Sequence, residues 1–269
     1  MTERRLTVAR KGKLTPDRFG WNMPVDSPLF SKLPHYFINA EILQITYETD
    51  EEAVLDLLPE GVEVATPATA VLTVFRFPFG TLGSYNEAAL DLACVWQGEQ
   101  KFYTAYNLVD NDAGMGAGRE IWGVPKKQAH IDIGKEFDLV MGTVERPKGN
   151  RLFTVLVRPE APADISRFTG TSRLCLRVIP NVEEGRGPAV AELVDRNGHR
   201  TTPKEVWTGR GSLTFNVPSE IDPWYKLGVK RILSATYGTY DYILGYGKVL
   251  RTYTDRGEAE RQEEWSQGR

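Results

Sequence analysis

The amino-acid sequence predicts a mainly β protein of α+β character, in which short antiparallel strands build one sheet that curls or closes. From Val62 onward, runs rich in Val, Phe and Thr recur, and turns with Gly, Pro or Asn separate them. Only two segments have apolar residues at helical spacing. No internal repeat and no linker-like stretch interrupts the sequence, so we expect one domain over residues 1–269.

The N-terminal part of the sequence predicts an extended arm, one strand and one short helix. Residues 1–30 carry three prolines and little periodicity, which favours the arm. Residues 37–46 alternate between apolar and polar side chains, as a half-buried strand does. Thr49-Asp50-Glu51-Glu52 is a capping box for a helix that Pro59-Glu60-Gly61 ends.

The rest of the sequence predicts strands and one further helix over residues 223–233, which has apolar residues on one side. Four tyrosines within residues 234–246 suit the core or a subunit interface; alternatively, one hydroxyl relays a proton. Residues 251–269 are expected to form a polar surface tail. The predicted strands are 70–79, 90–96, 101–109, 130–133, 137–145, 151–158, 173–179, 189–194 and 211–216.

Composition indicates an ordinary globular chain and excludes several functions. Apolar residues make up 41% of the sequence and charged residues 26%, and the formal net charge of −3 gives no basic footprint for nucleic acid. No apolar run approaches the ~20 residues that span a bilayer, and the basic N-terminus lacks the apolar core of a signal peptide. Cys94 and Cys175 lie in strand-like runs, which favours buried free thiols in a reducing cytoplasm.

The sequence gives no sign of a metal or a cofactor, and we predict neither. His35, His130 and His199 are not spaced as metal ligands. The glycine patterns that bind phosphates or dinucleotides are missing, as is the nucleophile elbow of hydrolases. Glycines 114–118 instead predict a bend where the backbone passes close to another group.

One stretch, Gly118–Lys127, leads through glycines and large apolar side chains to two lysines. A lysine in water is an ammonium ion, because its pKa is ~10.4. Burial among side chains such as Trp122 and Val124 would lower this pKa and free the amine for attack on a carbonyl. In a strand, Lys126 and Lys127 would face opposite sides, so Lys127 would perturb Lys126 little. The simpler alternative is a turn with two surface lysines.

Several motifs together resemble the acetoacetate decarboxylase family. Gly118-Arg119-Glu120 is followed by Pro125-Lys126-Lys127. The family order continues with Tyr47-Glu48-Thr49-Asp50, Val178-Ile179-Pro180-Asn181 and Glu205-Val206-Trp207-Thr208-Gly209. The resemblance covers about residues 25–250, which we take as the core. It implies a conical, largely antiparallel, β-barrel-like sheet with a few peripheral helices, assembled into a homo-oligomer.

The resemblance also implies roles for individual residues. Lys126 would form a Schiff base with a ketone. Glu87, in a stretch similar to a Tyr-Thr-Glu motif of the family, would be the general acid/base; alternatively it is an ordinary loop carboxylate. Lys127 and Glu120 would tune the pKa of the amine or be structural. The residues expected to bind the substrate are Tyr85, Arg76, Arg119, Trp122, Tyr237 and Tyr240.

Two positions depart from the family pattern. Family decarboxylases have an arginine near the first strand that is thought to hold the substrate carboxylate, and Ala40 stands at that place. A second family glutamate maps near Leu72-Thr73, where no carboxylate occurs. The pocket is therefore expected to be less charged than that of an acetoacetate enzyme, with Arg76 or Arg119 as candidates for binding an anion.

We therefore predict a lyase that decarboxylates a β-keto acid through an imine and an enamine at Lys126. Its substrate would be a small-molecule keto acid that is larger or more apolar than acetoacetate. The alternative is an aldolase-dehydratase or cyclase that acts on an α-keto acid such as pyruvate through the same lysine. A third possibility is a non-catalytic barrel that binds small molecules. No nucleic-acid or membrane partner is expected.

Overall fold

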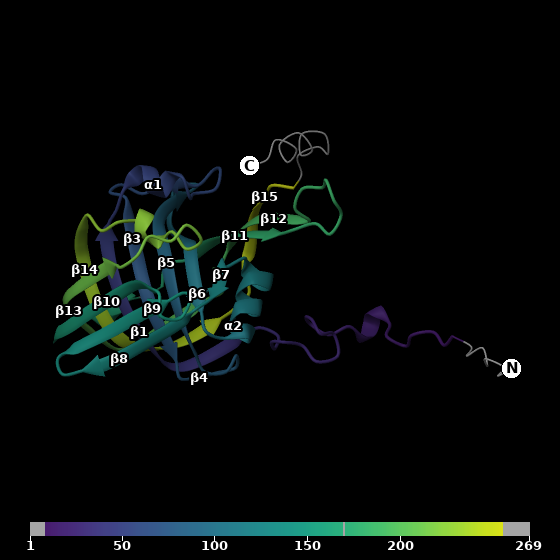
Figure 1. Ribbon diagram of the computed structural model, residues 1–269, viewed down its shortest axis with the longest axis horizontal. Helices are drawn as coiled ribbons and strands as arrows, with labels where there is room; N and C mark the ends of the chain where they lie inside the picture. Colours follow the sequence, from purple (N-terminus) through teal and green to yellow (C-terminus); the bar gives the residue numbers. More distant parts are fainter. Residues whose placement is uncertain (1–8, 169, 255–269) are drawn as a thin grey trace.

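The computed structural model describes residues 9–168 and 170–254. In this part of the chain, fifteen strands belong to one mixed sheet that curls around an apolar interior (Figure 1). In chain order the strands are β1 (His35–Glu48), β2 (Glu63–Val64), β3 (Thr69–Phe77), β4 (Phe79–Gly80), β5 (Tyr85–Trp96), β6 (Glu99–Val109), β7 (Lys126–Gln128), β8 (His130–Glu136), β9 (Leu139–Glu145), β10 (Arg151–Pro162), β11 (Arg173–Ile179), β12 (Val190–Asp195), β13 (Arg200–Phe215), β14 (Arg231–Leu244) and β15 (Lys248–Thr252).

The pairing of the strands confirms a mainly β, largely antiparallel fold. Neighbouring strands follow the order β15-β12-β11-β6-β5-β3-β1-β14-β13-β10-β9-β8, and β2, β4 and β7 pair with β5, β1 and β6 beside this path. Among the described strands, the β6–β7 and β6–β11 pairs are parallel and the others are antiparallel. The strand path ends at β15 and β8, which do not pair with each other in the described residues, so the sheet is curled but not closed.

Strand β1 buries both of its faces, because the sheet packs on two apolar clusters. Leu43 and Ile45 belong to the larger cluster, whereas Ala40 and Ile42 belong to the smaller one. This division follows from the alternation of side chains along a strand. The smaller cluster includes Trp122 and borders the candidate site.

The helical segments are short and lie at the periphery. Asp50 caps the first of them by accepting the Ala53 N–H at 3.2 Å, one residue after the expected cap. Thr49 instead donates its hydroxyl to the Gly228 carbonyl at 2.9 Å. The segments are η1 (Pro16–Arg18), α1 (Glu51–Leu55), α2 (Asp112–Ala117), the π-helical turn η2 (Gly118–Trp122), η3 (Ile165–Phe168) and η4 (Trp224–Lys226).

Two expectations about local structure are wrong. The helix predicted over 223–233 is only the turn η4, and β14 begins at Arg231. The end of this segment already belongs to β14, where Arg231 and Ile232 pair with β1, and this pairing outweighs the weak helical spacing. Glycines 114–118 form α2 and the start of η2 rather than a bend. The close approach expected there is confirmed, because a Cβ on Gly116 would lie 2.8 Å from Leu29 Cδ2.

The N-terminal arm projects from the sheet, as the sequence predicts (Figure 1). Its last part is anchored, since Asn22 accepts the Leu29 N–H at 2.7 Å and Phe30 is buried. The first residues of the predicted tail, 251 and 252, belong instead to strand β15, and the tail lies outside the described residues from residue 255 on. Both predicted buried free thiols, Cys94 and Cys175, are confirmed. None of the helices in residues 9–168 and 170–254 has the length and apolar character needed to cross a membrane.

Candidate active site

Lys126 opens the short strand β7, which lies parallel to β6 with Asn107 opposite Lys126. The chain reaches this strand through the turn η2 and Gly123, whose φ of 76° is in the left-handed region that favours glycine. Arg119 donates to the Lys126 carbonyl at 3.0 Å, so the Gly118–Trp122 turn fixes the backbone of the lysine. Trp122 is buried and donates its indole N–H to the Gly245 carbonyl.

Gly118 leaves room for the side chain of Lys126. A Cβ at residue 118 would lie 2.6 Å from Cδ and 2.7 Å from Cε of Lys126. Carbon atoms that are not bonded to each other do not approach so closely. The glycine that begins η2 is therefore a steric requirement for the extended lysine, and not only a flexible link.

The amine of Lys126 forms an ion pair with Glu87 inside the fold. The distance from Nζ to Glu87 Oε2 is 2.7 Å, and the two side chains are only 6% and 12% exposed. Asn107 donates to the other carboxylate oxygen, Oε1, at 2.7 Å. Glu87 lies in the regular strand β5, not in a loop, and alternation along this strand places Tyr85, Glu87 and Asp91 on one face. Two strands thus hold the acid and its amide partner against the amine.

Lys127 faces the opposite side of β7, as predicted. Its Nζ lies 3.0 Å from the buried carboxylate of Asp222, which also accepts from Arg146 Nε at 2.9 Å. Glu120 is half-buried in the η2 turn.

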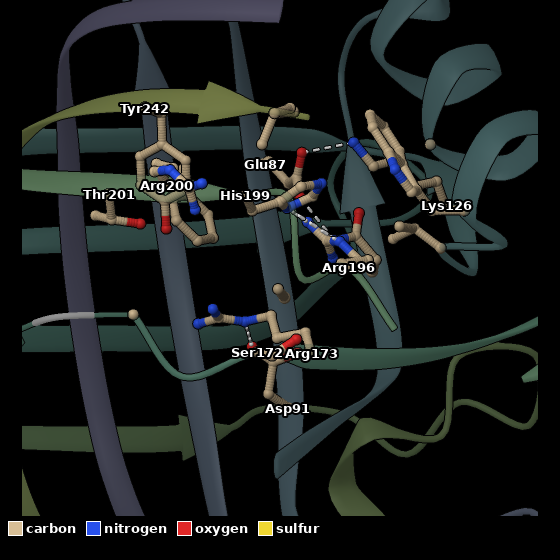
Figure 2. A pocket seen from close by; sticks show the side chains of 18 of the residues that line it. Glu87, Asp91, Lys126, Ser172, Arg173, Arg196, His199, Arg200, Thr201 and Tyr242 are labelled. Carbon is tan, nitrogen blue, oxygen red and sulfur yellow. Dashed lines mark hydrogen bonds and ion pairs between the residues drawn. The ribbon is translucent and has the colours of Figure 1, made fainter. Parts of the chain in front are cut away.

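A cavity of about 200 Å³ opens at the amine of Lys126. Phe75, Phe77, Tyr85, Trp122 and Val124 supply apolar surface. Figure 2 shows the polar side chains around it, with Arg196 and His199 between Lys126 and Arg200 in this view. The charged and hydrogen-bonding residues of the lining include Glu87, Asp91, Asn107, Lys126, Ser172, Arg173, Arg196, His199, Arg200 and Thr201.

This lining differs from the weakly charged pocket that the sequence led us to expect. Asp91 is buried and accepts from Thr104 at 2.7 Å and from Arg173 Nε at 2.8 Å. The Arg173 pair therefore holds β11 to β5 across the cavity. Arg196 and Arg200 follow β12 in the chain and add two further guanidinium groups to the lining.

His199 is held as a neutral ring. Its Nδ1 lies 3.0 Å from Arg196 Nη2 and 3.3 Å from Arg196 Nε. A guanidinium only donates hydrogen bonds, so Nδ1 accepts and the ring proton is on Nε2. Burial, the charge of Arg196 and other nearby cations hold the pKa of His199 well below its usual value. In the described part of the chain, the buried Nε2 has no hydrogen-bond partner.

Tyr85 and His35 also depart from their usual ionisation. Complete burial, with the negative charge of Glu87 as a smaller cause, raises the pKa of Tyr85 well above its usual value. Its hydroxyl therefore stays protonated beside the amine, whose Nζ is 5.7 Å from the ring centre. Burial and the positive charge of Lys126 lower the pKa of His35 to about 4. His35 lies edge-on to Trp122 at a centroid distance of 6.4 Å.

The residues expected to contribute to the site divide into two groups. Lys126, Glu87, Tyr85 and Trp122 come together in the cavity. The other four expected substrate-binding residues lie elsewhere. Arg119 holds the Lys126 carbonyl, Arg76 lies 3.4 Å from Glu41, Tyr237 donates to Glu41 in a separate groove, and Tyr240 lines a neighbouring cavity.

Sequence reasoning missed the residues that come from distant strands. Asn107, Arg173, Arg196 and Arg200 line the cavity, but none stands in a recognisable motif. One signal was available for His199, because histidines are scarce in this sequence. Ala40 and Thr73, the positions without the family's charged groups, are fully buried.

A lysine that is buried at the wall of a partly apolar cavity is in the setting that can activate an amine as a nucleophile, and Glu87 places a proton acceptor beside it. The curled sheet and this pair define a Schiff-base enzyme like acetoacetate decarboxylase. The chain belongs to the acetoacetate decarboxylase family, since the family model "Acetoacetate decarboxylase (ADC)" matches residues 22–254.

Individual relatives agree with this assignment. "Acetoacetate decarboxylase 1" of Bradyrhizobium diazoefficiens is 30% identical over 240 residues, which are 88% of this chain and 94% of the relative. The crystal structure of acetoacetate decarboxylase from Legionella pneumophila superposes with a TM-score of 0.81 at 28% identity, covering 91% of this chain and 99% of that one. The enduracididine biosynthesis enzyme MppR, complexed with pyruvate, shares the fold at a TM-score of 0.74 and 20% identity, over 88% of this chain and 99% of its own.

Proposed function

We propose that this chain is a Schiff-base-forming lyase that decarboxylates a β-keto acid through Lys126. The observation that carries the proposal is the 2.7 Å contact between Lys126 Nζ and Glu87 Oε2 at the wall of the cavity. It places a proton acceptor directly on the amine that must lose a proton before it can attack. The relatives named as acetoacetate decarboxylases support the reaction class.

The first half of the reaction makes the imine. Glu87 accepts a proton from the ammonium group of Lys126, and the neutral amine attacks the ketone carbon. The resulting carbinolamine loses its hydroxyl as water when Glu87 returns the proton. A protonated imine and an ionised Glu87 remain. Asn107 holds the carboxylate in place through its 2.7 Å hydrogen bond, so the same oxygen can accept and return the proton.

The second half uses the imine as an electron sink. The bond between the α-carbon and the carboxylate breaks, CO2 leaves, and the electron pair forms the enamine while neutralising the nitrogen. Glu87, reprotonated from solvent, protonates the enamine carbon, and water then releases the ketone product and the free lysine. The apolar surface of Phe77, Trp122 and Val124 limits competing access of water to the intermediates.

One observation favours a second candidate, an aldolase-dehydratase or cyclase that acts on an α-keto acid. Ala40 and Thr73 are buried and uncharged, whereas the family pattern has an arginine and a glutamate at or near these two positions. MppR, which shares the fold, has been solved with pyruvate and with the condensation product of pyruvate and imidazole 4-carboxaldehyde. In this reaction the enamine adds to an aldehyde, and no CO2 is released.

Borohydride trapping tests the proposal. Reduction in the presence of a ketone or keto acid should leave a mass adduct on Lys126 of the wild type and none on Lys126→Met. Release of CO2 from a β-keto acid then identifies the decarboxylase, whereas condensation of pyruvate with an aldehyde identifies the alternative. A wild-type chain that binds keto acids but gives no adduct is a non-catalytic binding barrel, and the proposal is then wrong.

A further inference from the structure

Two guanidinium groups of the cavity stand without a carboxylate. In residues 9–168 and 170–254, no Asp or Glu lies within ion-pairing distance of Arg196 or Arg200, whereas Arg173 is 2.8 Å from Asp91. Arg196 is half-buried, with its guanidinium 6.0 Å from the centre of the Trp122 ring. Holding a cation away from water without a counter-ion is costly, so this position suits a site that an anion occupies.

Arg196 and His199 together offer donors to one oxyanion. Arg196 fixes the tautomer of His199, so that the ring proton is on Nε2, which is unpartnered in the described residues. Lys126 and His199 line the same cavity, and the pKa of His199 is lowered by burial first and then by the charges of Arg196, Arg173 and Lys126. A carboxylate bound by Arg196 and His199 would therefore lie close to the amine that attacks the ketone.

The charges of the cavity do not balance. The positively charged lining residues are Lys126, Arg173, Arg196 and Arg200, and the negatively charged ones are Glu87 and Asp91. His199 is neutral, and Lys126 carries one positive charge both as an ammonium ion and as a protonated imine. An excess of two positive charges remains for the ligand, and a substrate with one carboxylate neutralises only half of it.

We infer that the substrate is a keto diacid, with one carboxylate held by Arg196 and His199 and the second held by Arg200. The inference rests on the proposed imine at Lys126. Arg200 is exposed and lies beside Tyr242 and Thr201, across from Lys126 in Figure 2, with Arg196 between them. The cavity of about 200 Å³ is smaller than the ~300–1,000 Å³ of typical drug-sized sites, which suits a short diacid.

Acetone, acetoacetate and 3-oxopentanedioate test this inference, because they share one ketone and carry zero, one and two carboxylates. The measured quantity is the concentration of each compound that gives half-maximal borohydride trapping on the full-length wild type. We expect this concentration to fall at both steps of the series. The first carboxylate should lower this concentration about 10- to 100-fold, as expected for a charged hydrogen bond. The second should lower it about two- to fivefold, since Arg200 is exposed.

Three variants assign the two steps to residues. Arg196→Gln should abolish the decrease in half-maximal concentration between acetone and acetoacetate, and Arg196→Lys should restore part of that decrease. Arg200→Gln should abolish only the further decrease in half-maximal concentration between acetoacetate and 3-oxopentanedioate. Acetone has no carboxylate for these arginines to bind, so its trapping in each variant is the reference against which the change for the two acids is measured. This also reports that the variants fold. Arg210→Gln, an exposed arginine paired with Glu160, is the matched control and should change nothing.

The outcomes separate this inference from the function on which it rests. If no carbonyl compound is trapped on Lys126, the proposed Schiff-base function is wrong. If all three compounds are trapped at similar concentrations, or if Arg196→Gln weakens acetone as much as the acids, Lys126 chemistry stands and the keto-diacid inference is overturned.

Discussion

Lys126 and Lys127 are neighbours in the chain, and each lies within 3.0 Å of a carboxylate, yet the two pairs do different things. Glu87 holds Lys126 at the wall of a cavity and has one further partner, the amide of Asn107. Asp222 is shared by Lys127 and Arg146 and is 4% exposed. In the proposed function, the first pair keeps a reactive amine beside a proton acceptor. The second pair joins β7 to the segment before η4, with charges that remain in place.

The comparison teaches that an ion pair alone does not identify a catalytic lysine. What separates the two pairs is their surroundings. Lys126 has an adjoining cavity, and Gly118 gives it space. Lys127 donates instead to fixed protein groups, Asp222 and the Ile221 carbonyl. Predictions that exchange or disturb these surroundings therefore test the assignment directly.

The largest expected effect is the loss of all trapping in Lys126→Arg. Arginine keeps the positive charge beside Glu87, but it stays protonated in proteins and cannot form an imine. Mass spectrometry after borohydride reduction should find no adduct at any keto acid concentration. An adduct that persists in this variant, or one that maps to Lys127 in the wild type, would reverse the roles of the two lysines.

Glu87→Gln should slow imine formation by about 10²- to 10⁴-fold, the usual contribution of a positioned acid/base. Glutamine keeps the size of the side chain and an oxygen for Asn107, but it cannot take the proton from the amine. The single-turnover rate of trapping measures this effect. Asp222→Asn, at the other lysine, is the control and should leave that rate unchanged; a comparable slowing there would mean that the two carboxylates act alike.

Gly118→Ala should slow trapping by about 10²-fold, because displacing a reacting group by about 1 Å has a cost of this size. The new Cβ would lie 2.6 Å from Cδ of Lys126, so the side chain has to move. Gly134→Ala on β8 meets nothing within 4 Å and is the matched control. Unchanged trapping in Gly118→Ala would show that the lysine does not need its observed path.

The sequence predicted that Lys126 and Glu87 act together, because each stands in a short motif of local residues, and the structure brings the two side chains together at the cavity. It was also sufficient for most strands, where alternation and turn residues agree over seven or more positions, as in β11 and β1. It failed at 223–233, because Arg231 and Ile232 already pair with residues 47 and 48 of β1, far away in the chain. Local periodicity contains no information about those partners.

The missed part of the site has the same physical cause. Asn107 meets Lys126 only because β6 and β7 pair in parallel. Arg173 meets Asp91 because β11 also pairs with β6, the strand next to β5. Arg196 and Arg200 stand in an ordinary polar turn by sequence. Conversely, Arg76 is flanked by two phenylalanines in the sequence, but alternation along β3 points it away from the cavity towards Glu41.

The pH dependence of stability should report the charge of Lys126, because this charge acts on the ionisation of His35. Its pKa is about 4 in the folded chain, through burial and the charge of Lys126. The unfolded chain binds this proton already near pH 6.5, so stability should fall as pH decreases from about 6.5 to 4, by about 3 kcal/mol. Urea unfolding of wild type and His35→Asn at several pH values measures the difference. Lys126→Met should lessen it, and Lys127→Met should not.

The smallest effect is expected for Lys127→Met. It leaves Asp222 with Arg146 as its ion-pair partner, and because Lys127 is 42% exposed the loss should be about 1 kcal/mol of unfolding free energy. Trapping on Lys126 should be unchanged, and the midpoint of its pH profile should move by less than about one unit, since the two side chains face opposite sides of β7. A larger shift would mean that the charge of Lys127 reaches the amine across the strand. Lys127 would then have to be counted among the groups that activate Lys126.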